Sequence, residues 1–233
     1  MATWIPARRL APELMDDPGI DPGEHDRALR GLSRLNRVSM ADRPLWQRLG
    51  RLASGRSVLR VLDVATGGGD VPARLHGRAV AADVPVHWWL SDISPHALRV
   101  AMERLQRAGA RADGFVHDIV GAAPPGSYDV ALCSLFLHHL NRADAVAALR
   151  HMAEAAPHVI ISDLRRTRAG MVLAAGASRV LSRSLVVHTD AVLSARAAWT
   201  AREAADMASE AGVRDARVTP VWPSRFVLEW GPA

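Results

Sequence analysis

Short apolar runs alternate along this chain with longer segments whose apolar residues recur every three or four positions. From Val58 onward the runs predict strands near 58–64, 86–92, 112–117, 128–134 and 158–164. Helices are expected between them near 71–83, 95–108 and 143–155, and a helix near 200–211 precedes two last strands near 215–221 and 224–230. This order predicts an α/β fold with a largely parallel sheet and helices on both faces.

Two segments fall outside the alternation. Leucines recur at helical spacing in the first fifty or so residues, at Leu29, Leu35, Leu45 and Leu49. We therefore expect a helical cap over residues 1–55 and the main domain over residues 56–233. Residues 165–200 are apolar and punctuated by arginines, which predicts a helical insert after the fifth strand. A lid, a dimer contact and a membrane-surface helix all remain open as its role.

The composition is that of a globular protein with one buried core. The 233 residues are 49% hydrophobic and 23% charged, which suits a single α/β domain. The single cysteine, Cys133, excludes an internal disulfide framework and a cysteine zinc cluster. The first ten residues lack the apolar core of a signal peptide, and no apolar run reaches the roughly 18 residues of a membrane span. We therefore expect a cytoplasmic protein without a membrane span.

Arginine supplies all the basic charge of the chain. There are 29 basic residues and no lysine, and the formal net charge is +5. The arginines are scattered among carboxylates, so no nucleic-acid surface is expected. The lack of lysine also excludes a phosphate-binding P-loop and Schiff-base chemistry.

The most informative stretch leads from an apolar strand through an acid into three glycines: Leu62-Asp63-Val64-Ala65-Thr66-Gly67-Gly68-Gly69-Asp70. Glycine leaves no Cβ in the way, so a ligand can lie directly on the backbone of this loop. Pro72 takes the place of the last glycine in the dinucleotide fingerprint G-x-G-x-x-G, which argues against an NAD(P)-linked oxidoreductase. The pattern Asp-x-Ala-x-Gly-x-Gly resembles motif I of the class I S-adenosyl-L-methionine (SAM) methyltransferases. The local sequence is most similar to that of the ubiquinone/menaquinone C-methyltransferase branch and its small-molecule relatives.

This resemblance implies both a fold and a cofactor. The fold is a Rossmann-like, seven-stranded class I methyltransferase sheet whose last two strands form an antiparallel hairpin. The cofactor is SAM, a sulfonium cation without a pyrophosphate. The loop residues expected to hold it are Asp63, Ala65, Thr66, Gly67 and Gly69.

An acid also ends the second strand. Asp92 follows the glycine loop by about 20 residues and is placed to accept hydrogen bonds from two ribose hydroxyls, with Ile93 beside it. Capping of the next helix is the other role for this position, because Asp92 or Ser94 leads into Pro95 at the first helical turn. The two roles are compatible.

The third and fourth strands add further cofactor residues. In the methyltransferase pattern Asp118 accepts the adenine amino group, and the apolar Ile119 packs on the ring. Ser134, at the end of the fourth strand, belongs to the same expected set. In the helical cap, Arg37 is a candidate partner of the SAM carboxylate, although a solvated helix face is the more usual place for such an arginine.

Two adjacent histidines follow the fourth strand. The strand and its histidine-containing turn resemble motif IV of small-molecule methyltransferases and lack the Asn/Asp-Pro-Pro-Tyr signature of base and amide N-methyltransferases. His138 or His139 is a candidate acceptor for a phenol proton, with His139 slightly preferred, while a polar turn or a packed imidazole is the structural alternative. Adjacent histidines also suggest a metal, but no third ligand stands nearby along the chain, so no metal is predicted.

The sequence thus predicts a SAM-dependent methyltransferase that acts on a small, largely apolar acceptor of phenolic, quinone-like or polyketide type. The insert over residues 165–200 is expected to shape the acceptor pocket. A non-catalytic SAM-binding subunit is the alternative, and an NAD(P)-linked oxidoreductase is a more distant one. The acceptor, the methylated atom and the oligomeric state stay open.

Overall fold

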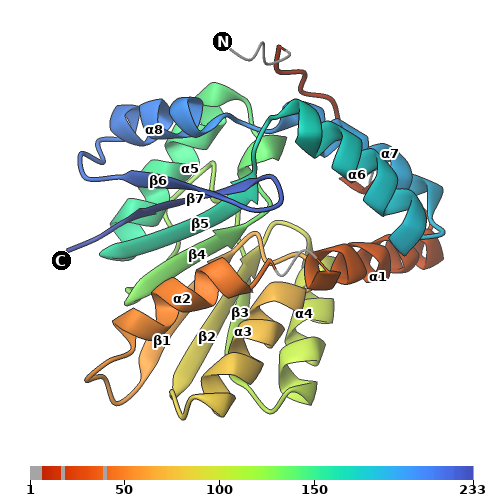
Figure 1. Ribbon diagram of the computed structural model, residues 1–233. Coiled ribbons are helices and arrows are strands. Elements are labelled where there is room, and N and C mark those ends of the chain that lie inside the picture. Colours follow the sequence, from red (N-terminus) through yellow and green to blue (C-terminus); the bar gives the residue numbers. More distant parts are fainter. Residues whose placement is uncertain (1–6, 17–18, 39–40, 233) are drawn as a thin grey trace.

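The computed structural model describes residues 7–16, 19–38 and 41–232 and shows helices packed around one central sheet (Figure 1). The strands are β1 (Leu59–Val64), β2 (Val86–Asp92), β3 (Arg111–Val116), β4 (Val130–Ser134), β5 (His158–Leu164), β6 (Arg217–Val221) and β7 (Arg225–Trp230). The α-helices are α1 (Pro22–Val38), α2 (Arg43–Leu52), α3 (Asp70–Ala81), α4 (Pro95–Arg107), α5 (Arg142–Ala155), α6 (Arg168–Leu181), α7 (Leu185–Ala197) and α8 (Ala201–Glu210). Two short 3-10 helices are η1 (Leu14–Asp16) and η2 (Leu137–His139).

The seven strands form one sheet in the order β3-β2-β1-β4-β5-β7-β6. The first five strands are parallel, and β7 runs antiparallel to both β5 and β6. This arrangement confirms the predicted Rossmann-like, seven-stranded class I methyltransferase sheet. Because the chain moves one way from β1 to β3 and the other way from β4 onward, the order reverses between β1 and β4, where open α/β sheets bind ligands.

Each face of the sheet carries its own apolar core, because successive strand residues point to opposite sides. On β4, Ala131 and Cys133 pack toward α5 and α8, while Val130 and Leu132 pack toward α2, α3 and α4. All four of these side chains are fully buried. A sheet buried on both faces explains why these strands read as nearly continuous apolar runs.

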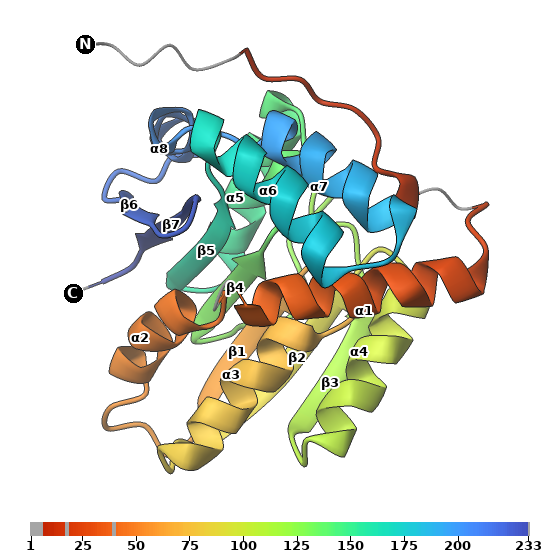
Figure 2. The same cartoon turned by 45° about the vertical axis from the view of Figure 1, so that its right-hand side comes forward.

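The N-terminal helices of the expected cap have different neighbours. In α2, Leu45 and Leu49 are fully buried in the same core as Val61 of β1. Helix α1 instead lies between the α6–α7 pair and the ends of α3 and α4 (Figure 2). Thus α1 covers the edge of the sheet at which the parallel strands end, while α2 belongs to one of its faces.

The insert after β5 consists of two helices, whereas the sequence predicted one. Helix α6 ends at Leu181 and has Ser182 as its C-cap, whose hydroxyl accepts a hydrogen bond from the Ser184 amide at 3.1 Å. Ser184 is then the N-cap of α7 and accepts a hydrogen bond from the Val187 amide at 3.4 Å. The two serines on either side of Arg183 break the apolar stretch, because their hydroxyls satisfy backbone groups at a helix end. This turn brings α7 back against α6.

Within the described parts of the chain, none of the helices has the length and apolar character needed to cross a bilayer. The expectation that no signal peptide is present depends on the first ten residues, of which residues 1–6 lie outside the described part.

The glycine loop allows α3 and α4 to pack closely. Gly69 has φ +68°, and a Cβ at this position would lie 2.7 Å from Cα and Cβ of Ala101 on α4. We expect Gly69→Ala to lower the free energy of unfolding by roughly 2–4 kcal/mol, from the left-handed backbone and the overpacking together. Urea denaturation followed by circular dichroism measures this loss.

Gly109→Ala is the matched control, because Gly109 has φ +74° but nothing lies within 4 Å of its added Cβ. This variant should lose only the roughly 1–2 kcal/mol of the backbone conformation. Equal losses in the two variants would show that the α3–α4 contact does not constrain Gly69.

Candidate functional site

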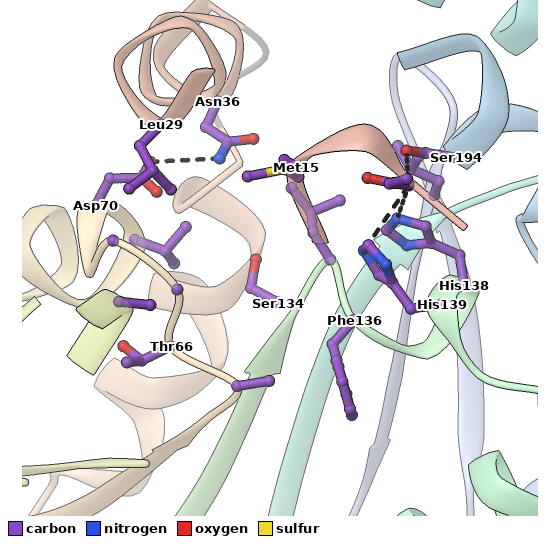
Figure 3. A pocket seen from close by; sticks show the side chains of 18 of the residues that line it. Met15, Leu29, Asn36, Thr66, Asp70, Ser134, Phe136, His138, His139 and Ser194 are labelled. Carbon is purple, nitrogen blue, oxygen red and sulfur yellow. Dashed lines mark hydrogen bonds and ion pairs between the residues drawn. The ribbon is translucent and has the colours of Figure 1, made fainter. Parts of the chain in front are cut away.

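The parallel strands end at a cavity of about 1360 Å³ that lies at the reversal point of the sheet. Its lining comes from the ends of β1, β2 and β4 and from α1, α6 and α7. In Figure 3, Thr66 and Asp70 lie on one side of the cavity, Ser134 near its middle, and His138, His139 and Ser194 on the other side. The cavity exceeds the roughly 300–1,000 Å³ of a usual single-ligand pocket, so it has room for two small molecules.

The loop after β1 adopts an unusual backbone conformation, with residues at positive φ. Ala65 has φ +52° and Gly67 has φ +53°, and both line the cavity. Leu135, directly after β4, is also in the left-handed region, with φ +59°. Non-glycine residues in this region cost of the order of 1 kcal/mol or more and concentrate at ligand sites. Strain is therefore present on both sides of the reversal point.

Asp92 ties this loop to β2. The Gly67 amide donates to Oδ2 of Asp92 at 2.8 Å, and the Ser94 amide donates to Oδ1 at 2.9 Å. Ser94 itself caps α4, since its hydroxyl accepts a hydrogen bond from the Ala97 amide at 3.2 Å. The helix is thus capped by Ser94, and Asp92 lines the cavity with Ile93.

The remaining residues of the expected cofactor set also line the cavity, except Gly69 in the loop and Arg37 in the cap. Asp118, Ile119 and Ser134 are part of the lining, and Oδ1 of Asp118 accepts a hydrogen bond from the Val120 amide at 2.9 Å. Gly69 is buried against α4 and is not part of the lining.

Arg37, the residue of the cap expected to bind the SAM carboxylate, does not reach the cavity. Arg37 is exposed on α1 and is not part of the lining, because the neighbouring Asn36 is the residue that turns inward. Nδ2 of Asn36 donates to Asp70 at 3.3 Å, and its Oδ1 accepts from the buried Arg225 at 3.2 Å. Burial lowers the pKa of Arg225 to about 10, so its guanidinium is still charged at neutral pH.

Carboxylates dominate the charge of the cavity. Among the described residues that line it, the carboxylates are Glu13, Asp63, Asp70, Asp92, Asp118 and Asp144, and the arginines are Arg104 and Arg225. This excess of negative charge favours a cationic ligand, although the chain as a whole has a formal charge of +5.

Asp63 is the most perturbed of these acids. It is 2% exposed, and burial raises its pKa from 3.8 to about 7, against the lowering effect of the neighbouring Thr66 side chain. The carboxyl groups of Asp70 and Asp92 raise the pKa further. A cation bound in the cavity would therefore favour the ionised form of Asp63.

On the opposite side of the cavity, His138 is fixed by a carboxylate. Its Nδ1 lies 2.6 Å from Oδ1 of Asp163, and its backbone amide donates to Oδ2 of the same residue at 3.0 Å. Burial lowers the pKa of His138, but the charge and hydrogen bond of Asp163 outweigh it, and Glu13 adds to them, so that the pKa rises to about 10. His138 is therefore a cation at neutral pH and a poor proton acceptor.

Glu13 comes from the N-terminal segment and lies beside both histidines. Its Oε1 is 3.6 Å from Nε2 of His138 and 3.9 Å from Nε2 of His139, and it accepts a hydrogen bond from the Ser194 hydroxyl. Burial raises the pKa of Glu13, but the hydrogen bond with His138 and the charges of both histidines lower it below the ordinary value. Glu13 is therefore ionised.

Two side chains hold the N-terminal segment in place. The carboxylate of Asp190 on α7 accepts the amides of Leu14 at 2.8 Å and Met15 at 3.1 Å, which satisfies the start of η1. Arg8 lies 3.5 Å over the ring of Trp199 and donates from Nη2 to the His138 carbonyl at 3.0 Å. The segment is thus anchored on both sides of Glu13.

His139 is the more accessible member of the pair. Its side chain is 24% exposed, compared with 4% for His138. Its ring is stacked with Phe136 at a centroid separation of 6.4 Å and lies 4.3 Å from the His138 ring. Of the two histidines, the geometry favours His139 for contact with a bound molecule.

Sequence reasoning missed Glu13, Asp190 and Arg8, because nothing in the pattern of the N-terminal segment indicates that it reaches the histidines. Asp163 had a detectable signal, since it stands near the end of a parallel strand like Asp92.

Comparison with known proteins is consistent with this geometry. A family model described as a methyltransferase domain matches residues 61–157. The ubiquinone biosynthesis O-methyltransferase of Ralstonia nicotianae is 33% identical over 127 residues, which are 53% of this chain and 51% of that protein. The chain thus spans about half the length of this curated relative.

Solved structures share the fold at lower identity. A SAM-dependent methyltransferase from Aquifex aeolicus superposes with a TM-score of 0.62 at 16% identity, over 90% of this chain and 97% of that one. A magnesium protoporphyrin IX methyltransferase from Synechocystis, solved with bound S-adenosylhomocysteine (SAH), gives a TM-score of 0.57 at 18% identity, over 92% and 90% of the two chains.

The raised pKa of Asp63 has a consequence for stability. Unfolding returns this carboxyl group to its ordinary pKa of 3.8, whereas it titrates near 7 in the fold. The folded state therefore holds its proton more tightly, and the contribution of this group to stability is full below about pH 4 and is lost as the pH rises through about 7. The loss should amount to a few kcal/mol.

Asp63→Asn cannot ionise and should remove this dependence. The difference in unfolding free energy between the variant and the wild type should grow in favour of the variant from about pH 5 to about pH 8. Chemical denaturation at several pH values measures it. A difference that stays constant over this range would mean that Asp63 is not the titrating group.

Proposed function

We propose that this protein transfers the methyl group of SAM to an oxygen of a small, largely apolar phenolic acceptor, since residues 61–157 match a family model described as a methyltransferase domain. The observation that carries the proposal is the two-sided cavity: a strained glycine loop with acids on one side, and a histidine–carboxylate cluster on the other.

On the loop side, SAM binds along the ends of β1 to β3. Asp92 accepts the ribose hydroxyls, while its bond to the Gly67 amide keeps the loop in the shape that receives the cofactor. A carboxylate has about four lone-pair sites, which allows it to accept from backbone and ligand together. Asp118 accepts the adenine amino group and Ile119 packs against the ring. Ala65, Thr66 and Ser134 contact the rest of the molecule from the ends of β1 and β4.

The amino-acid end of SAM lies between α1 and the loop. The carboxyl groups of Asp63 and Asp70 attract the ammonium and the sulfonium group. Arg225, charged and oriented by Asn36, takes the carboxylate in place of Arg37. A buried guanidinium binds a carboxylate more strongly than an exposed one, because solvent screens it less.

The acceptor occupies the other side. The described residues of α6 and α7 that line this wall are mostly apolar: Leu173, Ala174, Ala177, Leu181 and Ala191. Glu13, His138 and His139 form the polar part of the same wall. In this proposal, the N-terminal segment within residues 1–55 and the insert within residues 165–200 shape the acceptor pocket around the SAM-binding domain. An acceptor with an apolar body and one polar group suits this surface.

The transfer is an in-line displacement. The phenol releases its proton to solvent, and a lone pair of the phenolate oxygen forms the new bond to the methyl carbon. The carbon–sulfur bond breaks, and its electron pair stays on sulfur as SAH leaves. The protein mainly aligns the two reactants and excludes water, which can lower the barrier by roughly 7–11 kcal/mol.

Binding of SAH to an Asp92→Ala variant tests the cofactor assignment. The variant should bind SAH at least about tenfold more weakly than the wild type, since it loses charge-assisted hydrogen bonds to ribose and the anchor of the loop. Isothermal titration calorimetry measures the affinities. Asp113→Asn is the control, because Asp113 contacts His87 and is not part of the cavity lining. Equal affinities for SAH in the Asp92 variant and the wild type would reject the ribose assignment.

A screen of phenols, quinones and amines with SAM tests the activity. Mass spectrometry should detect a gain of one CH₂ unit in a phenolic compound, and His139→Ala should lower turnover while its affinity for SAH stays within about twofold of the wild type. SAH binding without methyl transfer to any phenol would contradict the proposal and favour a non-catalytic SAM-binding subunit.

A further inference from the structure

The cluster of Glu13, His138 and His139 has the composition and spacing of a metal site. Each residue offers one ligand atom, and the three atoms lie within 4.8 Å of one another. The two imidazole Nε2 atoms are 3.6 and 3.9 Å from Oε1 of Glu13. Ligands bonded to one ion at about 2.0–2.2 Å are themselves roughly 3–4 Å apart, so both separations fit a shared ion.

We propose that Glu13, His138 and His139 bind one divalent transition-metal ion, with Zn²⁺ preferred, and that this ion holds the oxygen of the methyl acceptor. The binding of the ion is independent of the proposed function, whereas its role toward the acceptor rests on it.

The hydrogen bond between His138 and Asp163 favours ligation. With the proton on Nδ1, directed at Oδ1 of Asp163 at 2.6 Å, the lone pair of Nε2 faces Glu13 and His139. Metal-binding histidines usually donate their second nitrogen to a carboxylate in this way, which fixes the tautomer and the ring orientation. An arriving ion displaces the proton that Nε2 otherwise carries.

The carboxylate ligand, Glu13, is also held in position by neighbouring residues. Ser194 on α7 donates to Oε1 of Glu13, and Asp190 on the same helix fixes the amides of Leu14 and Met15 just after it. Glu13 is therefore held from α7, while His138 is held from β5 by Asp163. Two separate parts of the fold bring the ligands together.

The donor set selects the kind of ion. Two imidazoles and one carboxylate suit Zn²⁺ and related transition metals, whereas Mg²⁺ and Ca²⁺ prefer oxygen ligands alone. Three protein ligands leave a further coordination position, as in catalytic zinc sites. All three residues line the cavity, so this position faces the space assigned to the acceptor.

The ion would activate the acceptor directly. A phenol oxygen that coordinates the ion releases its proton to solvent at a lower pH, since the metal stabilises the phenolate. The phenolate then uses a lone pair to bond the methyl carbon, and the carbon–sulfur pair stays on SAH. No separate protein base is needed, and the charge balances, because an anion and a sulfonium cation give two neutral groups.

Titration of the chelator-treated full chain with Zn²⁺ alone tests the site. Calorimetry should show one equivalent bound with a dissociation constant below roughly 1 μM, and much weaker binding of Mg²⁺. Glu13→Gln and His139→Ala should each weaken Zn²⁺ binding by roughly a hundredfold, and Ser194→Ala by roughly tenfold. The Glu13 and His139 variants should also fail to show the visible absorption that Co²⁺ gains when it binds to the wild type.

His87→Gln is the matched control. His87 Nε2 lies 2.6 Å from Asp113, a histidine–carboxylate pair outside the cavity, and this variant should bind Zn²⁺ like the wild type. The Glu13 and His139 variants should have circular dichroism spectra like that of the wild type, which separates loss of a ligand from loss of fold.

The outcomes separate the two proposals. Failure to bind Zn²⁺ at one equivalent, or unchanged affinity in both the Glu13 and His139 variants, would overturn the metal site. Zn²⁺ binding without methylation of any phenol would leave the site in place and reject the proposed function. Full methyl transfer in the presence of excess chelator would reject the role of the ion toward the acceptor.

Discussion

The hydrogen bond between the Gly67 amide and the Asp92 carboxylate connects the parts of the site. It joins the loop after β1 to the end of β2 at 2.8 Å, beside the point where the strand order reverses. The loop contains Ala65 and Gly67 at positive φ, and the absence of a side chain at Gly69 lets the start of α3 pack against α4. The same carboxylate lines the cavity, so the interaction that shapes the loop also presents an anion to a ligand.

A second set of charges lies across the cavity and has a different origin. Asp163 lies near the end of β5, His138 and His139 follow β4, and Glu13 belongs to the N-terminal segment held by Asp190. Buried charges of this kind are costly unless they are paired, and here each is paired. The paired charges lie where two imidazoles and a carboxylate face the same part of the cavity. This arrangement suits a metal ion or an acceptor oxygen.

Much of the fold was predictable from the sequence, because both the apolar runs of the buried strands and the three-to-four-residue apolar spacing of the helices are clear. Strands 86–92 and 158–164 were predicted with the bounds that β2 and β5 have, and the antiparallel hairpin at the end was implied by the family resemblance. The insert was predicted as one helix, since Ser182 and Ser184 are ordinary polar residues until their hydroxyls are seen to cap helix ends. On the loop side of the cavity, Asp63, Asp92 and Asp118 lie at or just after the ends of strands, so local patterns were sufficient to predict that they lie together.

The histidine side of the cavity was less predictable, because its residues come from segments far apart in the sequence. Glu13 is remote from His138 along the chain, and spacing alone therefore indicated no third metal ligand. Arg37 and Asn36 are neighbours on α1, and only the packing of the helix shows that Asn36 faces the cavity. Contacts between segments far apart in sequence require the tertiary structure.

The central claim is that the acids at the strand ends and the glycine loop hold an adenosyl sulfonium with its reactive end toward the histidine cluster. A crystal structure of the protein with SAH tests this most directly. The account predicts both ribose hydroxyls within hydrogen-bonding distance of Asp92 and the sulfur facing the side of the cavity that holds His139. Ribose bound away from Asp92, or a sulfur directed away from the histidines, would contradict it.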